Sequence, residues 1–140
     1  MRQLVVDASV VLKWFVPEVH SVAAARILNA DVALYAPDLL GPEFGNILWK
    51  KVRRGEIDRD EADDIMNAFG SLPLEIRPSS VLLPSAFELA VALDRTVYDS
   101  LYLALAVAED CPLITADAKF HAALAGTRLS GHVQWVGDEI

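Results

Sequence analysis

Short apolar runs alternate with longer amphipathic segments along this chain. The first run, residues 4–6, has no polar alternation, which is typical of a strand buried on both faces. Comparable runs lie at residues 33–35, 74–76, 113–115 and 133–136. The pattern predicts five short strands, and the first of them is expected at the centre of a sheet.

Segments with helical apolar spacing lie between and after these runs. They are predicted at about residues 10–15, 21–29, 39–54, 59–69, 80–93, 98–109 and 118–124. Strands that alternate with helices indicate an α/β fold with a mostly parallel sheet and helices on both faces. The length favours one domain over residues 1–140.

Four acidic residues stand at the ends of these elements or beside the core. Asp7 directly follows the first run, and Asp117 follows the fourth. Open α/β sheets place their functional crevice at the carboxyl ends of the strands, so these two carboxylates are expected to converge. Asp99 begins an apolar helix, and Glu43 lies among apolar neighbours on another. The four are candidates for a single site.

Each acid also has a purely structural explanation. Aspartate is a favoured N-cap, which suits Asp7 and Asp117, and Asp99 follows Thr96 in an approximate capping box. Glu43 is open to interpretation as a half-exposed glutamate at a helix edge. The motifs that hold the acids contain no obvious basic partner for them. Four neighbouring carboxylates would repel one another, and a divalent cation would relieve that repulsion.

The available ligand types narrow the choice of metal. The candidate ligands are oxygen atoms, and His20, His121 and His132 lie outside the motifs. Oxygen ligands favour Mg²⁺, with Mn²⁺ as the alternative, over Zn²⁺. The single cysteine, Cys111, excludes an internal disulfide and suits a cytoplasmic protein. No apolar run approaches the roughly 20 residues that span a bilayer, so no membrane association is expected.

Charge limits the partners. The chain has 20 acidic and 12 basic residues and a net charge of −8, so its surface as a whole should repel nucleic acid. A local exception is WKKVRRG, with Lys50, Lys51, Arg53 and Arg54. These cations would suit RNA phosphates, or would simply complement the dipole at a helix C-terminus. The sequence leaves both roles open.

Four motifs resemble those of PIN-domain ribonucleases, and within that superfamily those of the VapC toxins of prokaryotic toxin–antitoxin pairs. They are VVDASVVLKWF, PEFGNILW, YDSLYLALA and LITADAKF, and they extend over most of residues 4–120. The resemblance implies a five-stranded parallel sheet in the order 3-2-1-4-5. It also implies magnesium-dependent endonucleolytic cleavage of RNA, a homodimer, and inhibition by a cognate small DNA-binding antitoxin of the VapB type.

By the same resemblance, the catalytic, metal-binding acids are Asp7, Glu43, Asp99 and Asp117. Asp7 and Asp99 are expected to bind the ion directly. Glu43 and Asp117 are expected to complete its surroundings through water molecules or a second ion. No member of the acidic quartet is missing, so the sequence gives no sign of an inactive enzyme.

Supporting roles are predicted for three polar residues. Ser9 and Thr115 lie two residues from an acid, where a hydroxyl can orient a carboxylate or a water. Asn46 lies about one helical turn after Glu43 and is a candidate ligand for a water or a substrate phosphate. For each of the three, a local turn or cap hydroxyl or an exposed amide is the competing explanation.

Three other functions are alternatives. A housekeeping PIN nuclease without an antitoxin would share the same motifs, whereas the other two fit less well. A receiver domain would need adjacent acids after its first strand and a lysine after a late strand, whereas Asp7 stands alone and no lysine follows residues 133–136. A non-catalytic partner-binding module would have no need of four mutually repelling carboxylates.

Overall fold

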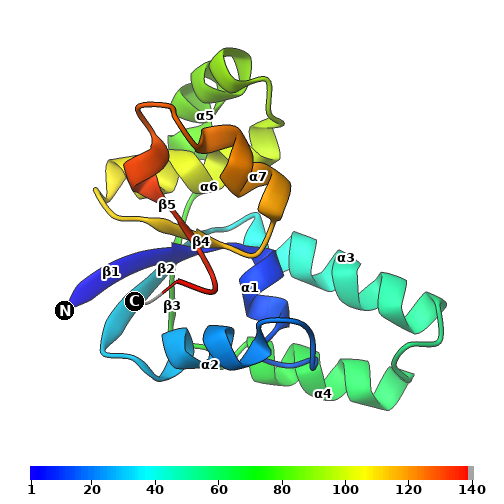
Figure 1. The fold of residues 1–140 in the computed structure, drawn as a ribbon. Helices are drawn as coiled ribbons and strands as arrows, with labels where there is room; N and C mark the ends of the chain where they lie inside the picture. Colours follow the sequence, from blue (N-terminus) through cyan, green and yellow to red (C-terminus); the bar gives the residue numbers. More distant parts are fainter. Residues whose placement is uncertain (139–140) are drawn as a thin grey trace.

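A five-stranded parallel sheet forms the centre of the computed structural model, which describes residues 1–138 (Figure 1). Its order is β3-β2-β1-β4-β5, and every neighbouring pair is parallel. The strands are β1 (Arg2–Val6), β2 (Val32–Pro37), β3 (Leu74–Arg77), β4 (Leu113–Thr115) and β5 (Val133–Trp135). The predicted fold class and strand order are confirmed.

Helices connect the strands and cover both faces of the sheet. They are α1 (Ala8–Leu12), α2 (Ser21–Asn29), α3 (Leu40–Arg53), α4 (Arg59–Phe69), α5 (Ser79–Leu93), α6 (Val97–Ala108) and α7 (Ala118–Leu124), with a 3₁₀ turn, η1 (Ser130–His132), before β5. The largest departure from the predicted bounds is α1, which begins and ends earlier than residues 10–15. Asp7 caps this helix, so it starts directly after β1.

The sheet separates two hydrophobic cores. Leu4 and Val6 face the core that α1, α2 and α3 complete, whereas Val5 faces the core made with α5, α6 and α7. This alternation follows from the two-residue period of a strand. Figure 1 shows α1–α4 on one side of the sheet and α5–α7 on the other. All three of these β1 residues are fully buried, as the sequence predicts.

Helix α6 packs directly on the sheet and positions the acid at its start. Every residue from Ser100 to Ala106 is buried, and α6 contacts β1, β2 and β4. This packing fixes the first turn of α6, with Asp99, beside the ends of the central strands.

Although α6 is apolar on nearly all sides, no helix among residues 1–138 is long and apolar enough to cross a membrane.

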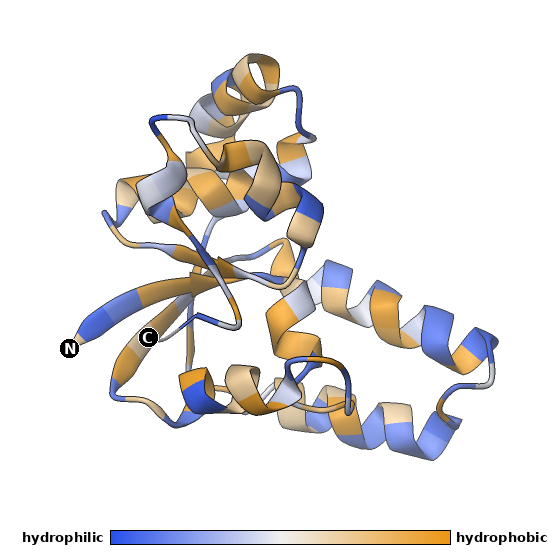
Figure 2. Cartoon of the chain, viewed as in Figure 1, coloured by the Kyte–Doolittle hydropathy of each residue, from blue (hydrophilic) through white to orange (hydrophobic). Residues whose placement is uncertain are grey.

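Helices α3 and α4 extend away from the sheet as a pair (Figure 1). Figure 2 shows that hydrophilic residues gather toward their outer ends, while the strands and the helices against them are mainly hydrophobic. The basic cluster of α3 lies in this polar part of the molecule. The first turn of α3, with Glu43, is at the other end of the helix, close to the sheet.

Candidate active site

A pocket of about 480 Å³ lies where β1 and β4 end. All four predicted acids, Asp7, Glu43, Asp99 and Asp117, line it. Asp7 and Asp117 follow the two strands, whereas Glu43 and Asp99 stand in the first turns of α3 and α6. The parallel sheet thus gathers carboxylates from four separate parts of the chain.

Asp7 is half-buried and is held by hydrogen bonds on both oxygens. Oδ1 accepts from the Ser9 backbone N–H (3.0 Å), the Ser9 hydroxyl and the Val10 N–H (3.2 Å), and Oδ2 accepts from the Thr115 hydroxyl (2.6 Å). Burial raises the pKa of Asp7, and the hydrogen bonds from Ser9, Thr115 and Val10 oppose that rise. Asp7 is also the N-cap of α1, so the capping explanation and a site role hold together.

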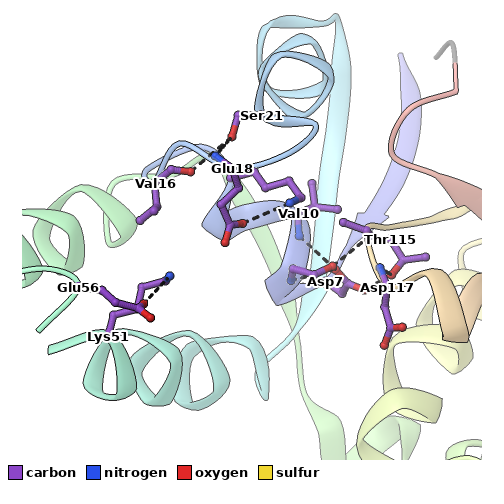
Figure 3. A network of polar contacts seen from close by, with 12 residues as sticks. Asp7, Val10, Val16, Glu18, Ser21, Lys51, Glu56, Thr115 and Asp117 are labelled. Carbon is purple, nitrogen blue, oxygen red and sulfur yellow. Dashed lines mark hydrogen bonds and ion pairs between the residues drawn. The ribbon is translucent and has the colours of Figure 1, made fainter. Parts of the chain in front are cut away.

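Ser9 and Thr115 join the ends of the two central strands. The Thr115 hydroxyl donates to Asp7 and accepts from the backbone N–H of Asp117 (3.0 Å), and the Ser9 hydroxyl accepts from Ala116 N–H (3.1 Å). Figure 3 shows Thr115 between Asp7 and Asp117, with a dashed line to Asp7. Asp117 also caps α7. The two hydroxyls therefore fix the relative placement of two site acids.

Glu43 is paired with a tyrosine on α6. Its carboxylate accepts a hydrogen bond from the Tyr102 hydroxyl. Burial raises the pKa of Glu43, the Tyr102 hydrogen bond lowers it, and the nearby charges of Asp7 and Asp99 raise it further. Burial together with the Glu43 carboxylate raises the pKa of Tyr102, so the phenol stays protonated and acts as the donor. The charges of Asp7 and Asp99 therefore act on Glu43 within the pocket.

Asp99 and Asp117 have a basic partner that lies outside the four motifs. Nη2 of Arg95 lies 2.9 Å from Asp99 Oδ2 and 4.0 Å from Asp117 Oδ2. Arg95 precedes the YDSLYLALA motif, so the prediction that the motifs themselves contain no basic partner does not extend to it. Its guanidinium also stacks over the ring of Phe120, 4.9 Å from the centroid.

One of the two unpredicted residues has a signal in the sequence. Tyr102 lies three residues after Asp99, and residues three or four apart face the same side of a helix. That spacing places Tyr102 on the side of α6 that carries Asp99. Arg95 precedes Thr96, the N-cap of α6, so helical spacing does not determine its position.

Part of the predicted basic cluster reaches the pocket. Lys50, Lys51 and Arg54 line it, and Lys51 also pairs with Glu56 at 3.2 Å (Figure 3). Arg53 does not line the pocket, because its guanidinium packs over the Trp49 ring. Basic side chains therefore stand at the same pocket as the acids.

The remaining predicted residues separate into two groups. Ser9 lines the pocket, and Thr115 contacts it through Asp7. Asn46 is exposed on α3 and is not among the lining residues. Lys13 and its partner Glu18, 3.2 Å apart, line the pocket as well.

The donor set of the pocket fits a hard divalent cation. Its lining offers carboxylates and a serine hydroxyl, and neither histidine nor cysteine is among the lining residues of the described chain. Within residues 1–138, no three His, Cys, Asp or Glu side chains are gathered closely enough to hold an ion as they stand. Asp99 is engaged with Arg95 and Glu43 with Tyr102, so these side chains must turn for an ion to bind.

Comparisons with known proteins agree with this fold. Residues 4–124 match the family model of the PIN domain. Ribonuclease VapC3 of Pyrobaculum aerophilum is 37% identical over 82% of this chain and 89% of its own length. Ribonuclease VapC1 of Mycobacterium tuberculosis is 34% identical over 88% of this chain and 92% of its own. The crystal structure of VapBC2 from Rickettsia felis, bound to a promoter DNA fragment, aligns with a TM-score of 0.67 at 15% identity, covering 95% of this chain and 98% of that chain.

Proposed function

The chain belongs to the PIN-domain family, with ribonucleases of the VapC type among its relatives, and from this we propose that it is a metal-dependent endoribonuclease. The observation that carries the proposal is the gathering of Asp7, Glu43, Asp99 and Asp117 around one pocket with basic side chains beside it. The reaction is hydrolysis of an RNA phosphodiester bond. Mg²⁺ is the expected ion, and Mn²⁺ the alternative.

Asp7 and Asp99 are the expected direct ligands of the ion. When bound, the ion lowers the pKa of a coordinated water and stabilises charge on the phosphoryl oxygens. Ser9 and Thr115 hold Asp7 in a fixed orientation, so little reorganisation is needed there.

Glu43 and Asp117 complete the surroundings of the ion. Tyr102 positions the carboxylate of Glu43 by its hydrogen bond. The cap interactions of Asp117 with the start of α7 engage Oδ1, and its other oxygen, Oδ2, faces Arg95. Both acids line the pocket, where water molecules or a second ion can join them to the bound ion.

Lys50, Lys51 and Arg54 are proposed to bind RNA phosphates. They provide positive charge at the pocket of a protein whose net charge is −8. Phosphate contacts of this kind hold a nucleic acid in register without reading its sequence. The proposed substrate is accordingly an RNA whose backbone passes along the part of the pocket that the last turn of α3 lines.

The proposed regulator is a small DNA-binding antitoxin of the VapB type. The relatives are VapC ribonucleases, and the Rickettsia felis neighbour is a VapBC pair bound to promoter DNA. Co-expression with the product of an adjacent short reading frame should yield a stable complex that no longer cleaves RNA. An active protein with no such neighbouring partner would instead be a housekeeping PIN nuclease.

A homodimer is proposed to form through α5. Its exposed apolar side chains include Val81 (74% exposed), Phe87 (60%) and Val91 (71%), with Leu83 beside them. Adjacent large apolar side chains on a helix surface are characteristic of protein contacts. This face lies across the sheet from α3 and α4, so pairing through it would leave the α3 side of the pocket open (Figure 1).

Cleavage of RNA by the purified protein tests the proposal. Activity is expected with Mg²⁺ or Mn²⁺ and should disappear with EDTA or in the Asp99→Asn variant. Asp63→Asn is the matched control, because Asp63 also lies four residues after an arginine that it pairs with, on exposed α4. Full activity in Asp99→Asn, or in EDTA, would contradict the assignment.

A further inference from the structure

Among the described residues, Arg95 is the only base that forms an ion pair with any of the four acids. One of its nitrogens, Nη2, faces an oxygen of Asp99 and an oxygen of Asp117, at 2.9 and 4.0 Å. Arg95 does not itself line the pocket, whereas Phe120, on which its guanidinium stacks, does. The positive charge therefore lies beside the pocket wall and draws two carboxylates toward it.

The contacts of Arg95 differ in kind from those of Asp7. Its Nε is buried and has no hydrogen-bond partner within residues 1–138, although a guanidinium offers five N–H donors. A buried unpaired donor is unfavourable. Asp7, in contrast, accepts hydrogen bonds on both oxygens. Arg95 is held by one hydrogen-bonded ion pair, one longer ion pair and one aromatic ring, so fewer hydrogen bonds must break to release Asp99 than to release Asp7.

We infer that Arg95 is an internal counter-ion that is displaced from Asp99 when a divalent ion binds. This inference rests on the proposed metal site. In the metal-free protein, Arg95 neutralises part of the repulsion among the acids and holds the carboxylate of Asp99 by a hydrogen-bonded ion pair. This explains why the four acids line one pocket yet no three of them are gathered around a point in the described chain. Arg95 thereby lowers metal affinity, both by occupying Asp99 and by repelling the ion.

Calorimetric titration of Mn²⁺ into metal-free protein tests this inference. The Arg95→Gln variant is expected to bind Mn²⁺ roughly five- to tenfold more tightly, the size expected for removing one unit charge about 8 Å from a double charge in water-like surroundings. Arg95→Lys keeps the charge and should stay near the wild-type affinity. Arg59→Gln is the matched control, because Arg59 pairs with Asp63 at the same spacing and distance but is exposed on α4.

The outcomes separate this inference from the proposal it rests on. The inference would be overturned if the Arg95→Gln variant bound Mn²⁺ no more tightly than the wild-type protein. It would also be overturned if the substitution changed the KM for RNA and left the Mn²⁺ affinity unchanged. Wild-type protein that binds no Mn²⁺ would instead overturn the metal site itself. A purely structural role for Arg95 would lower the melting temperature equally with and without Mn²⁺, whereas displacement predicts a smaller loss with Mn²⁺ bound.

A second measurement keeps the wild-type chain. The Nε–H signal of Arg95 in a nitrogen–proton NMR spectrum is identified by its absence from the Arg95→Lys spectrum. Titration with Mg²⁺ should shift this signal and leave that of Arg59 in place. An unmoved Arg95 signal in protein that has bound Mg²⁺ would overturn the inference even if Arg95→Gln fails to fold.

Discussion

Asp7 has a structural role, and we propose a chemical one as well. It caps α1 and, through the Thr115 hydroxyl, is linked to the end of β4. A cap alone needs one oxygen, yet both oxygens of Asp7 are engaged and the residue is half-buried. Burying a carboxylate is costly unless its charge is compensated. This geometry supports the proposal that the carboxylate of Asp7 binds a cation.

The raised pKa of Asp7 predicts a pH-dependent stability in metal-free protein. Because folding raises this pKa above its ordinary 3.8, the folded chain retains a proton that the unfolded chain releases. The contribution of Asp7 to stability is accordingly largest below pH 3.8 and is lost as the pH rises through the folded value. Asp7→Asn removes this dependence, so the variant should gain stability relative to wild type between about pH 4 and pH 7.

Urea unfolding of both proteins in EDTA at these two pH values measures the effect. The difference in unfolding free energy between variant and wild type should shift in favour of Asp7→Asn at the higher pH. The same difference at both values would show that burial does not disfavour the charged form of Asp7.

Removal of the Thr115 hydroxyl is predicted to lower activity through the position of Asp7, without any contact between Thr115 and the substrate. Thr115→Val keeps the shape but removes the donor to Asp7 and the acceptor for Asp117 N–H. Loss of these buried bonds should cost about 1–3 kcal/mol of unfolding free energy and lower kcat about tenfold as Asp7 loses its orientation. Thr127→Val, which removes similar local bonds near α7, should leave kcat unchanged. Wild-type kcat in Thr115→Val would contradict a positioning role.

At the scale of elements, α3 brings opposite charges to one pocket. Its first turn provides Glu43, and its last turn and C-cap provide Lys50, Lys51 and Arg54. The basic end complements the helix dipole, so the structural explanation for the cluster also stands. Only the residues of the cluster that line the pocket are positioned for the proposed binding of RNA phosphates.

A pair of substitutions on α3 separates these roles. Lys50→Gln and Arg53→Gln each remove one positive charge from the same helix, but only Lys50 lines the pocket. Lys50→Gln should raise the KM for RNA several-fold with kcat unchanged and reduce the salt dependence of binding by about one phosphate contact. Equal effects of the two variants would indicate a general charge effect instead of a specific contact.

Element order and strand positions were predictable because the apolar runs carry a clear period. Strands β1 and β4 are short, buried and followed by an acid, and the structure keeps them where the runs lie. The start of α1 was misplaced, because an aspartate directly after a strand allows a helix to begin without a loop. The pairing of Tyr102 with Glu43 joins α6 to α3, and no local pattern determines which helices meet.

At the scale of the whole molecule, the sheet divides the surface into distinct faces. The pocket opens between α1, α3 and α6, and the apolar side chains of α5 lie on the opposite side of the sheet from α3. The sequence indicated that the four acids would converge, since parallel strands end at one edge. It did not indicate the ion pairs of Arg95, because Arg95 lies before the N-cap of α6 and its pair with Asp117 depends on the distance between α6 and the loop after β4.

If the dimer forms through α5, a single charged side chain on the apolar face of this helix should dissociate it. Phe87→Glu should convert a dimer to a monomer in sedimentation equilibrium, because it buries an unpaired carboxylate in an apolar contact. Val22→Glu on α2, where the native valine is 71% exposed, is the control and should remain dimeric. A Phe87→Glu protein that still sediments as a dimer would place the interface elsewhere.

The central claim is that the pocket acids bind a divalent ion, and anomalous diffraction from a crystal soaked in Mn²⁺ tests it most directly. The account predicts an anomalous peak inside the pocket, bonded to carboxylate oxygens of Asp7 and Asp99, with Arg95 moved away from Asp99. A peak only at surface carboxylates, or an empty pocket in a crystal with Mn²⁺ bound elsewhere, would contradict it.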